Sequence, residues 1–375
     1  MINRARLVQT LSALIGINSE NPTGNEVRVA RWVKQFCRAC RIPVRLHEFH
    51  DRRPNVIATL PGTACRKSLL ITPHLDTVPA GGGWKTDPFT AVVKGGKLFG
   101  LGSTDCKGNL AVALEVLRSL AEDKHRLGYT LIFAATADEE SGSTHGLIPL
   151  IQKGMLRPDA VAVLDADDFE IVVAQKGLMH LKVTIRGRKA HGAYPWLGVN
   201  AIEKAMDILQ QLRRYRFSFR RNPFLRPPTM NIGTIRGGDK VNVVAGWCEF
   251  ELDVRFLPGM SHQKVLRDIK RIVRAHAHSW DIEIEGVQQP YLIDRTHPLV
   301  ASLSRAMRDS GVRPHIAGSE GATVITFFQE YGIPAVATGF GCSGCAHLSN
   351  EYITLDNLYK GARVLERFLK TFKFS

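Results

Sequence analysis

The chain has 375 residues, of which 44% are hydrophobic, and its 50 lysines and arginines exceed its 35 aspartates and glutamates, giving a formal net charge of +15. This length is more than one hydrophobic core usually supports, so two domains are expected. The hydrophobic fraction is that of a globular protein, and the absence of an apolar run of roughly 18 residues excludes a membrane-spanning helix.

The first residues are predicted to form an amphipathic helix and not a secretory signal. Leu7, Leu11 and Leu14 fall at helical spacing, no cleavage-like site follows, and Asn21-Pro22 is expected to stop the helix. The seven cysteines are odd in number and scattered, which is typical of free thiols in a reducing compartment. We therefore expect a cytoplasmic protein with no membrane partner.

Helices and strands alternate through the first half of the chain. Helix-like segments at 30–40 and 110–120 stand among apolar strands at 55–60, 68–72, 129–135 and 160–164. Strands without a clean polar alternation are typical of a sheet covered on both faces. The order of these elements favours an α/β layer architecture.

The pattern changes after Gly177. Strand, helix, strand, strand, helix and strand are predicted at 178–186, 199–212, 230–236, 248–256, 261–276 and 282–287. This order is ferredoxin-like. Helices at 298–309, 323–331 and 355–372, with a strand at 333–338, then resume the first pattern. We predict an α/β domain, residues 1–178 and 288–375, interrupted by an inserted α+β domain, residues 179–287.

Two features allow more than one interpretation. The CxxC pairs Cys37/Cys40 and Cys342/Cys345 suit either a split zinc site or ordinary buried thiols, and most of the chain separates them. The basic stretch RRYRFSFRRNPFLR, Arg213 to Arg226, has interleaved aromatic residues that suit a nucleic-acid strand. A solvated helix end and loop is the simpler interpretation, because no recognised nucleic-acid module surrounds it, so nucleic acid is not an expected partner.

Side chains that can bind metal follow several predicted strands. They lie in the turns PHLDTVP, GLGSTDCKG and TADEESGS, at the end of AVAVLD, and in the loop GCSGCAHLSNE: His74, Asp76, Asp105, Glu139, Glu140, Asp165 and His347. Singly, each has an ordinary interpretation as a loop histidine, a turn former or a surface acid. Ligands collect at the carboxyl ends of strands in open α/β sheets, so together these residues predict a cationic centre. Positive charge there would also explain two adjacent glutamates.

The order HLDTVP, GxxDxKG, ADEESGS, an acid and AHxxNE resembles the M20 metallopeptidase family, which includes acetylornithine deacetylase, succinyl-diaminopimelate desuccinylase, aminoacylase and carboxypeptidase G2. INSENPTGNE, GRKAHGAYPWLGVNAI and GGDKVNVVAGWCEFELDVRFLPG also resemble family segments, so the resemblance covers nearly the whole chain. It implies a zinc-peptidase-like α/β/α catalytic domain, a ferredoxin-like insert that acts as a dimerisation or lid domain, and a homodimer.

The resemblance also implies the ligands of two zinc ions per subunit, for which Co²⁺ and Mn²⁺ are candidate substitutes: His74, Asp105, Glu140, Asp165 and His347. Asp105 would bridge the ions, with His74 and Asp165 at one and Glu140 and His347 at the other. The family often has glutamate at the fourth position. Asp167 and Asp168 are therefore rivals of Asp165.

The two glutamates are expected to divide the chemistry. Neighbouring side chains diverge, so Glu139 cannot comfortably bind the ion that Glu140 holds. Glu139 would act as the general base toward a hydroxide held between the metals and pass its proton to the leaving nitrogen. Asp76 would accept a hydrogen bond from His74 and fix the tautomer of that ring.

Three residues of the insert are implied by the resemblance. His191 would reach the active site of the other subunit and stabilise the oxyanion, and Asn242 and Arg255 would contact substrate. Arg255 would hold a substrate carboxylate through its planar guanidinium group. Ordinary turn or surface positions are the alternative for His191 and Arg255.

Three departures from the family pattern leave details open. Glu320 in GSEGAT stands where the family often has Thr-Asp or Ser-Asp, and FGCSGCAH lacks the Gly-Pro-Gly of many deacetylases, so the substrate is open. Cys106 replaces the usual methionine after Asp105, where it would fill space, bind metal or be oxidised.

We therefore expect a metal-dependent amidohydrolase that cleaves the amide bond of an N-acyl amino acid or a related small anionic substrate, like acetylornithine deacetylase. A dipeptidase or carboxypeptidase of the same family is the alternative. A non-catalytic scaffold and a basic nucleic-acid-binding protein are the alternatives of another class.

Overall fold

The computed structural model describes residues 1–22, 24–63, 66–321 and 323–374, and the chain separates into two units. The first unit comprises Met1–Val173, Ile293–Ala317 and Thr323–Ser375, and the second comprises Ala174–Leu292 and Gly318–Ala322. The first is an α/β unit around a large sheet and the second is a ferredoxin-like α+β unit, which confirms the predicted fold class.

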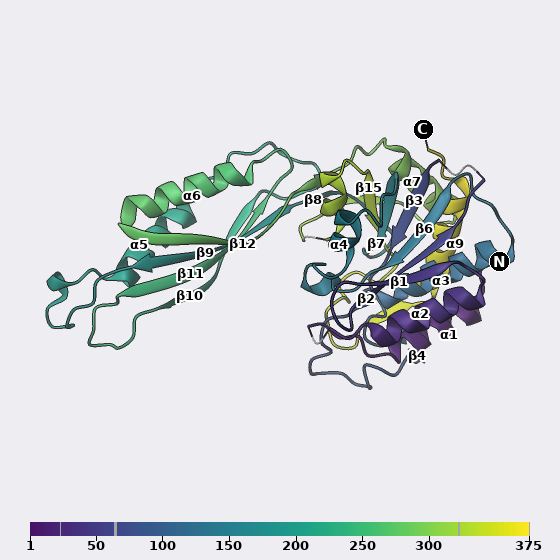
Figure 1. Cartoon of the computed structure of the whole chain (residues 1–375), viewed down its shortest axis with the longest axis horizontal. Helices are drawn as coiled ribbons and strands as arrows, with labels where there is room; N and C mark the ends of the chain where they lie inside the picture. Colours follow the sequence, from purple (N-terminus) through teal and green to yellow (C-terminus); the bar gives the residue numbers. More distant parts are fainter. Residues whose placement is uncertain (23, 64–65, 322, 375) are drawn as a thin grey trace. The chain divides into compact units, whose positions relative to one another are not determined.

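The first unit is built on a mixed sheet with strand order β1-β2-β6-β3-β7-β15-β8 (Figure 1). The strands are β1 (Val44–Glu48), β2 (Pro54–Leu60), β3 (Ser68–Thr72), β6 (Thr130–Ala135), β7 (Ala160–Leu164), β8 (Glu170–Gln175) and β15 (Ala335–Thr338). The central strands β6, β3, β7 and β15 run parallel to one another, whereas β1, β2 and β8 are antiparallel additions. Parallel central strands place their carboxyl ends at one edge of the sheet.

Helices cover this sheet because β7 and β15 are buried along their whole length and need apolar neighbours on both faces. The helices of the unit are α1 (Arg4–Ile15), α2 (Val27–Ala39), α3 (Lys107–Glu122), α4 (Leu147–Gln152), α7 (Pro298–Asp309), α8 (Ile325–Glu330) and α9 (Leu355–Thr371). A small sheet of β4 (Val92–Lys94), β5 (Lys97–Phe99) and β16 (Tyr352–Thr354) lies beside them, and β14 (His315–Ser319) pairs with β8.

The N-terminal helix ends earlier than the sequence predicts. Helix α1 stops at Ile15, where the N–H groups of Gly16 and Ile17 donate to the carbonyls of Ser12 and Leu14, so Asn21-Pro22 is not the stop. The residues between Ile15 and Pro22 instead bind the segment that follows β3. Ser19 Oγ donates to the Leu75 carbonyl, and Asn21 N donates to the Thr77 carbonyl. These hydrogen bonds hold residues that the sequence placed in further turns of helix α1.

The second unit has the predicted order of elements. Its sheet runs β10-β11-β9-β12, and α5 and α6 lie on one face of it (Figure 1). The elements are β9 (Gly177–Arg186), α5 (Ala201–Arg214), β10 (Thr229–Gly237), β11 (Trp247–Phe256), α6 (His262–His276), β12 (Ser279–Gln288) and β13 (Tyr291–Leu292). Strand β13 pairs with Ala174 and Gln175, which belong to the same unit. Alternate residues of β9 and β11 are buried against the helices, and the Ser261 side chain caps α6 by accepting from Lys264 N.

Within the described residues, no helix combines the length and the apolar composition that crossing a membrane requires.

Candidate metal centre

The sheet brings three of the predicted turns together. His74 follows β3, Glu139 and Glu140 follow β6, and Asp165 follows β7 directly. The strands are parallel neighbours in the order β6-β3-β7, so their carboxyl ends meet at one edge. Sites in open α/β sheets are found at this edge.

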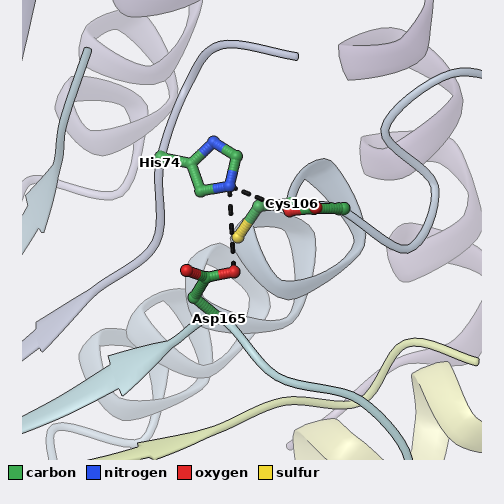
Figure 2. A group of neighbouring side chains, drawn as sticks. His74, Cys106 and Asp165 are labelled. Atoms are coloured by element: carbon green, nitrogen blue, oxygen red, sulfur yellow. Dashed lines mark hydrogen bonds and ion pairs between the residues drawn. The ribbon is translucent and has the colours of Figure 1, made fainter. Parts of the chain in front are cut away.

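One group of potential ligands gathers around His74. Its Nε2 lies 3.0 Å from Asp105 Oδ1 and 3.9 Å from Asp165 Oδ1. The thiol of Cys106 belongs to the same group, whose ligand atoms all lie within 4.8 Å of one another. Figure 2 shows the His74 ring, the Cys106 thiol and the Asp165 carboxylate converging on one small space.

A second group shares Asp105 with the first. His347 Nε2 lies 3.0 Å from Asp105 Oδ2 and 3.3 Å from Glu140 Oε2. The two oxygens of Asp105 therefore face different groups, Oδ1 toward His74 and Oδ2 toward His347. The described residues contain two groups that could hold a metal ion, and these are the two.

The residues fit divalent cations. Glu140 Oε1 is buried without a hydrogen-bond partner, an arrangement that is rare unless an ion or other group completes it. Burial, with the charge of Asp105, raises the pKa of Asp165 to about 7. Burial, with the charge of Asp165, raises the pKa of Glu139 well above its usual range. Carboxylates crowded in this way repel one another, and positive charge among them would relieve the repulsion.

Asp105 is held by a carboxylate that follows His347 in the chain. Glu351 is 2% exposed, and its two oxygens accept hydrogen bonds from three main-chain N–H groups, those of Gly102, Thr104 and Asp105, at 2.7–2.9 Å. One side chain thus fixes the turn that carries the shared ligand. It also ties that turn to the loop of His347, four residues earlier.

Asp76 supports the glutamate pair more than it supports His74. Its Oδ1 and Oδ2 accept from the main-chain N–H groups of Glu139 and Glu140, and its Oδ2 also accepts from Asn21 Nδ2. His74 Nδ1 lies 3.0 Å from the main-chain oxygen of Asp76 and 3.6 Å from its carboxylate. The expected contact to His74 is thus made by the backbone of Asp76.

A buried ion network lies behind the same turn. The Arg53 guanidinium contacts Glu26 Oε1 and Asp138 Oδ1, each at 2.7 Å, and all three side chains are buried. Asp138 also accepts from Thr144 Oγ1 and His145 N while its backbone is left-handed, with φ of 66°. This network holds the residue that precedes Glu139. The network was not predicted from the sequence, although Glu26 lies within the segment INSENPTGNE.

Of the three neighbouring aspartates, Asp165 is the one that lies with His74. Asp168 accepts from Ser343 N and Asn357 Nδ2, which gives it a structural place in the loop. Burial raises the pKa of Asp167 to about 7, and the charge of Asp105 adds to the effect. Cys106 Sγ donates to the Leu164 carbonyl at 3.0 Å, and burial raises the pKa of its thiol to about 11, so the thiol stays protonated at neutral pH.

The remaining predicted residues lie in the second unit. His191 is exposed, and its Nδ1 accepts from Ala193 N. Its backbone forms an isolated β-bridge with that of Val243, and the next residue, Gly192, donates its N–H to the Asn242 carbonyl at 2.8 Å. Arg255 is already engaged: its Nε and Nη2 donate to both oxygens of Asp253 at 2.7 and 2.9 Å. A substrate carboxylate would have to share or displace Asp253.

Two other sequence features have structural surroundings. Glu320 contacts Lys176 Nζ at 2.6 Å and accepts from Arg226 N, all within the second unit. Neither CxxC pair belongs to a group of the described residues that could hold a metal, so the split zinc site has no support. The six described cysteines are free thiols, and Cys65 lies outside the described residues.

Known proteins resemble this chain in sequence and in fold. Residues 70–371 match the sequence pattern of a protein family described as "Peptidase family M20/M25/M40". Acetylornithine deacetylase of Edwardsiella ictaluri is 31% identical over 315 residues, which cover 81% of this chain and 80% of that protein. A tripeptidase of Staphylococcus aureus has a TM-score of 0.81 at 25% identity, over 99% of this chain and 98% of that one. Aminopeptidase PepT of Bacillus cereus has a TM-score of 0.82 at 24% identity, over 98% of each chain.

Proposed function

The chain belongs to peptidase family M20/M25/M40 and is a metal-dependent hydrolase, and from this premise we propose that it is a dizinc deacylase of N-acyl amino acids. The observation that carries the proposal is the pair of ligand groups that share Asp105. The deacetylase of Edwardsiella ictaluri, similar over most of both chains, supports the acyl-amino-acid substrate. A cytoplasmic homodimer is part of the proposal.

We propose that His74 and Asp165 hold one zinc ion, Glu140 and His347 hold the other, and Asp105 serves both. Two bound ions would supply Lewis-acid activation of water and of the substrate carbonyl. The protein supplies the positions: Asp76 holds the main chain of the glutamate pair, and Glu351 holds the turn of Asp105.

Glu139 is proposed as the general base. It stands beside Glu140, and no hydrogen bond to its carboxylate is found in the described part of the chain, so the carboxylate is free to take up a proton. It would remove a proton from the attacking water and deliver it to the amide nitrogen as the C–N bond breaks. Its pKa, raised by burial, would fall beside positive charge and leave it ionised before the reaction.

The second unit is proposed to complete the site. His191 would donate a hydrogen bond to the oxyanion of the tetrahedral intermediate across the dimer, and Asn242 and Arg255 would contact the substrate. The Arg255 guanidinium already donates to Asp253, so a substrate carboxylate must either displace Asp253 or bind the guanidinium alongside it.

A peptidase is the second candidate, because the fold is that of an aminopeptidase and of a tripeptidase over nearly the whole chain. The substrate distinguishes the two: a peptidase cleaves between two amino-acid residues, whereas a deacylase removes a simple acyl group.

A hydrolysis screen tests both candidates. Purified protein is stripped of metal, reloaded with Zn²⁺, Co²⁺ or Mn²⁺, and given N-acetyl, N-succinyl and N-carbamoyl amino acids, dipeptides and tripeptides. The proposal expects N-acyl amino acids to give the highest kcat/KM. Cleavage of peptides alone would replace the deacylase with the peptidase. Failure on every class by protein that binds two metal ions would overturn both.

A further inference from the structure

The outward side of the two helices of the second unit concentrates positive charge. Residues 201–221 and 262–276, which cover α5, the segment after it and α6, hold eleven lysines and arginines but three aspartates and glutamates. This surplus of eight is more than half of the formal net charge of +15. We infer that this side, called the basic face below, binds the phosphate backbone of nucleic acids.

Helix α6 presents four of its five lysines and arginines in one row. The row recurs at helical spacings of three and four and consists of Lys264, Arg267, Arg271 and Arg274, all of them exposed. The opposite side of the helix, with Val265, Ile269 and Val273, is buried in the core of the unit. At 1.5 Å per residue the row is about 15 Å long, enough to follow several consecutive phosphates.

The segment after α5 joins this row. Tyr215 Oη donates to Asp268 Oδ2 at 2.8 Å, and Arg271 Nη2 contacts Asp268 Oδ1 at 2.9 Å. Asp268 is the single acidic residue of α6, and Arg271 of the basic face neutralises its charge. The same contact holds the arginine-rich end of α5 and the residues beyond it against α6, and Phe217 packs onto the core below.

Ten of the eleven basic residues of the face form no ion pair with the part of the chain that the structure describes. Within the described residues, Arg271 is the one lysine or arginine of the basic face that forms an ion pair. Eight of the eleven basic residues are arginines, whose planar fork matches two phosphate oxygens. An uncompensated surface of this kind repels itself and favours a polyanionic partner.

The apolar residues distinguish nucleic acid from a membrane surface. A helix that lies in a membrane interface needs an outward apolar side, but α5 and α6 direct theirs into the core. The large apolar side chains exposed on the described basic face are Met206 and Phe219. Phe219 is 37% exposed beside Arg220, and an exposed ring among arginines can stack on a base.

The inference does not depend on the hydrolase activity and is tested by binding. Fluorescence anisotropy of labelled 20-nucleotide single strands and duplexes, DNA and RNA, is measured against protein at 50–300 mM salt. We expect binding that weakens with salt, and a triple variant, Arg267→Gln/Arg271→Gln/Arg274→Gln, that lowers the slope of log K against log salt by about 2, at ~0.7 per single-strand phosphate contact.

The matched control removes the same charge elsewhere. Arg31→Gln/Arg38→Gln/Arg45→Gln replaces three exposed arginines of the first unit and should leave the slope unchanged. If the α6 variant fails to fold, Arg220→Gln/Arg221→Gln tests the same face in the segment after α5. No binding at 50 mM salt, equal losses in test and control variants, or binding to phosphatidylserine vesicles without binding to oligonucleotides would each overturn the inference.

Discussion

One carboxylate oxygen of Asp76 accepts a hydrogen bond from the main-chain N–H of Glu140 at 3.1 Å, and the other accepts one from the main-chain N–H of Glu139 at the same distance. One buried side chain, 0% exposed, thus sets the positions of a proposed metal ligand and a proposed base. The two glutamates cannot shift independently of it.

Replacing Asp76 with alanine should destabilise the protein and loosen the site together. Main-chain donors of Glu139 and Glu140 would lose their acceptor, and each buried unpaired group costs about 1–3 kcal/mol. We expect the free energy of unfolding to fall by roughly 2–5 kcal/mol in urea titrations, with weaker metal binding. Asp76→Asn, which keeps one acceptor oxygen, should be intermediate; an alanine variant of unchanged stability would contradict the assigned contacts.

Glu139→Gln should retain metal and lose turnover. The amide has the shape of the carboxylate but cannot take up a proton, so the rate should fall by about 10²-fold or more. Metal content by elemental analysis and kcat on the best substrate of the screen measure the two effects. Glu140→Gln is the matched comparison, because it should lose metal as well as rate. Normal turnover by the Glu139 variant would remove it as the base.

Metal uptake should weaken as the pH falls. In the metal-free protein, hydrogen bonds to Asp105 and Glu140 raise the pKa of His347 to about 10, and burial raises the pKa of Asp165 to about 7. Below these values both residues carry protons that a metal must displace, so lowering the pH from 8 to 6 adds protons to Asp165 and disfavours binding. Titration calorimetry in buffers of different ionisation enthalpy should show proton release, and its absence would place the metal elsewhere.

Arg53→Met should be among the most destabilising substitutions in the first unit. It leaves the buried carboxylates of Glu26 and Asp138 without their shared cation, and breaking such a pair costs about 3–5 kcal/mol. Adding Glu26→Leu removes one of the stranded charges and should recover part of the loss. Thermal and urea denaturation of the single and double variants measures the coupling, and additive losses would argue against a network.

His191→Ala tests the proposed role of the second unit. Loss of an oxyanion donor reduces kcat by about 10²–10³-fold, while zinc content should stay the same. His278→Ala, an exposed histidine of the same unit, is the control and should behave as wild type. Equal activity of both variants would leave His191 as a surface residue.

The fold was largely predictable because its signals are local. Alternating burial in β9 and β11 and the continuous burial of β7 follow from apolar spacing, and the Ser261 cap follows from residue type. The end of α1 was not predictable. Asn21 and Ser19 donate hydrogen bonds to the Asp76 carboxylate and the Leu75 carbonyl. Such contacts between distant segments produce no periodic pattern in the sequence.

The candidate site shows the same division. Ligand types after strands predicted a cationic centre, and the resemblance to the M20 family implied His74, Asp105, Glu140, Asp165 and His347 as its ligands, which the structure brings together. The supports of these residues were missed, because a buried Glu351 or Arg53 looks like any surface charge until its partners are known. The paired guanidinium of Arg255 was hidden for the same reason, although Asp253 stands two residues away.

The hydrogen bond from Asp105 to Glu351 joins residues that are 246 positions apart. A nascent polypeptide still attached to the ribosome presents His74 and Asp105 long before the segment that steadies them has been made. We therefore expect metal binding only after the chain is complete, and a fragment truncated before residue 351 should be recovered without the metal ion however much is supplied during synthesis.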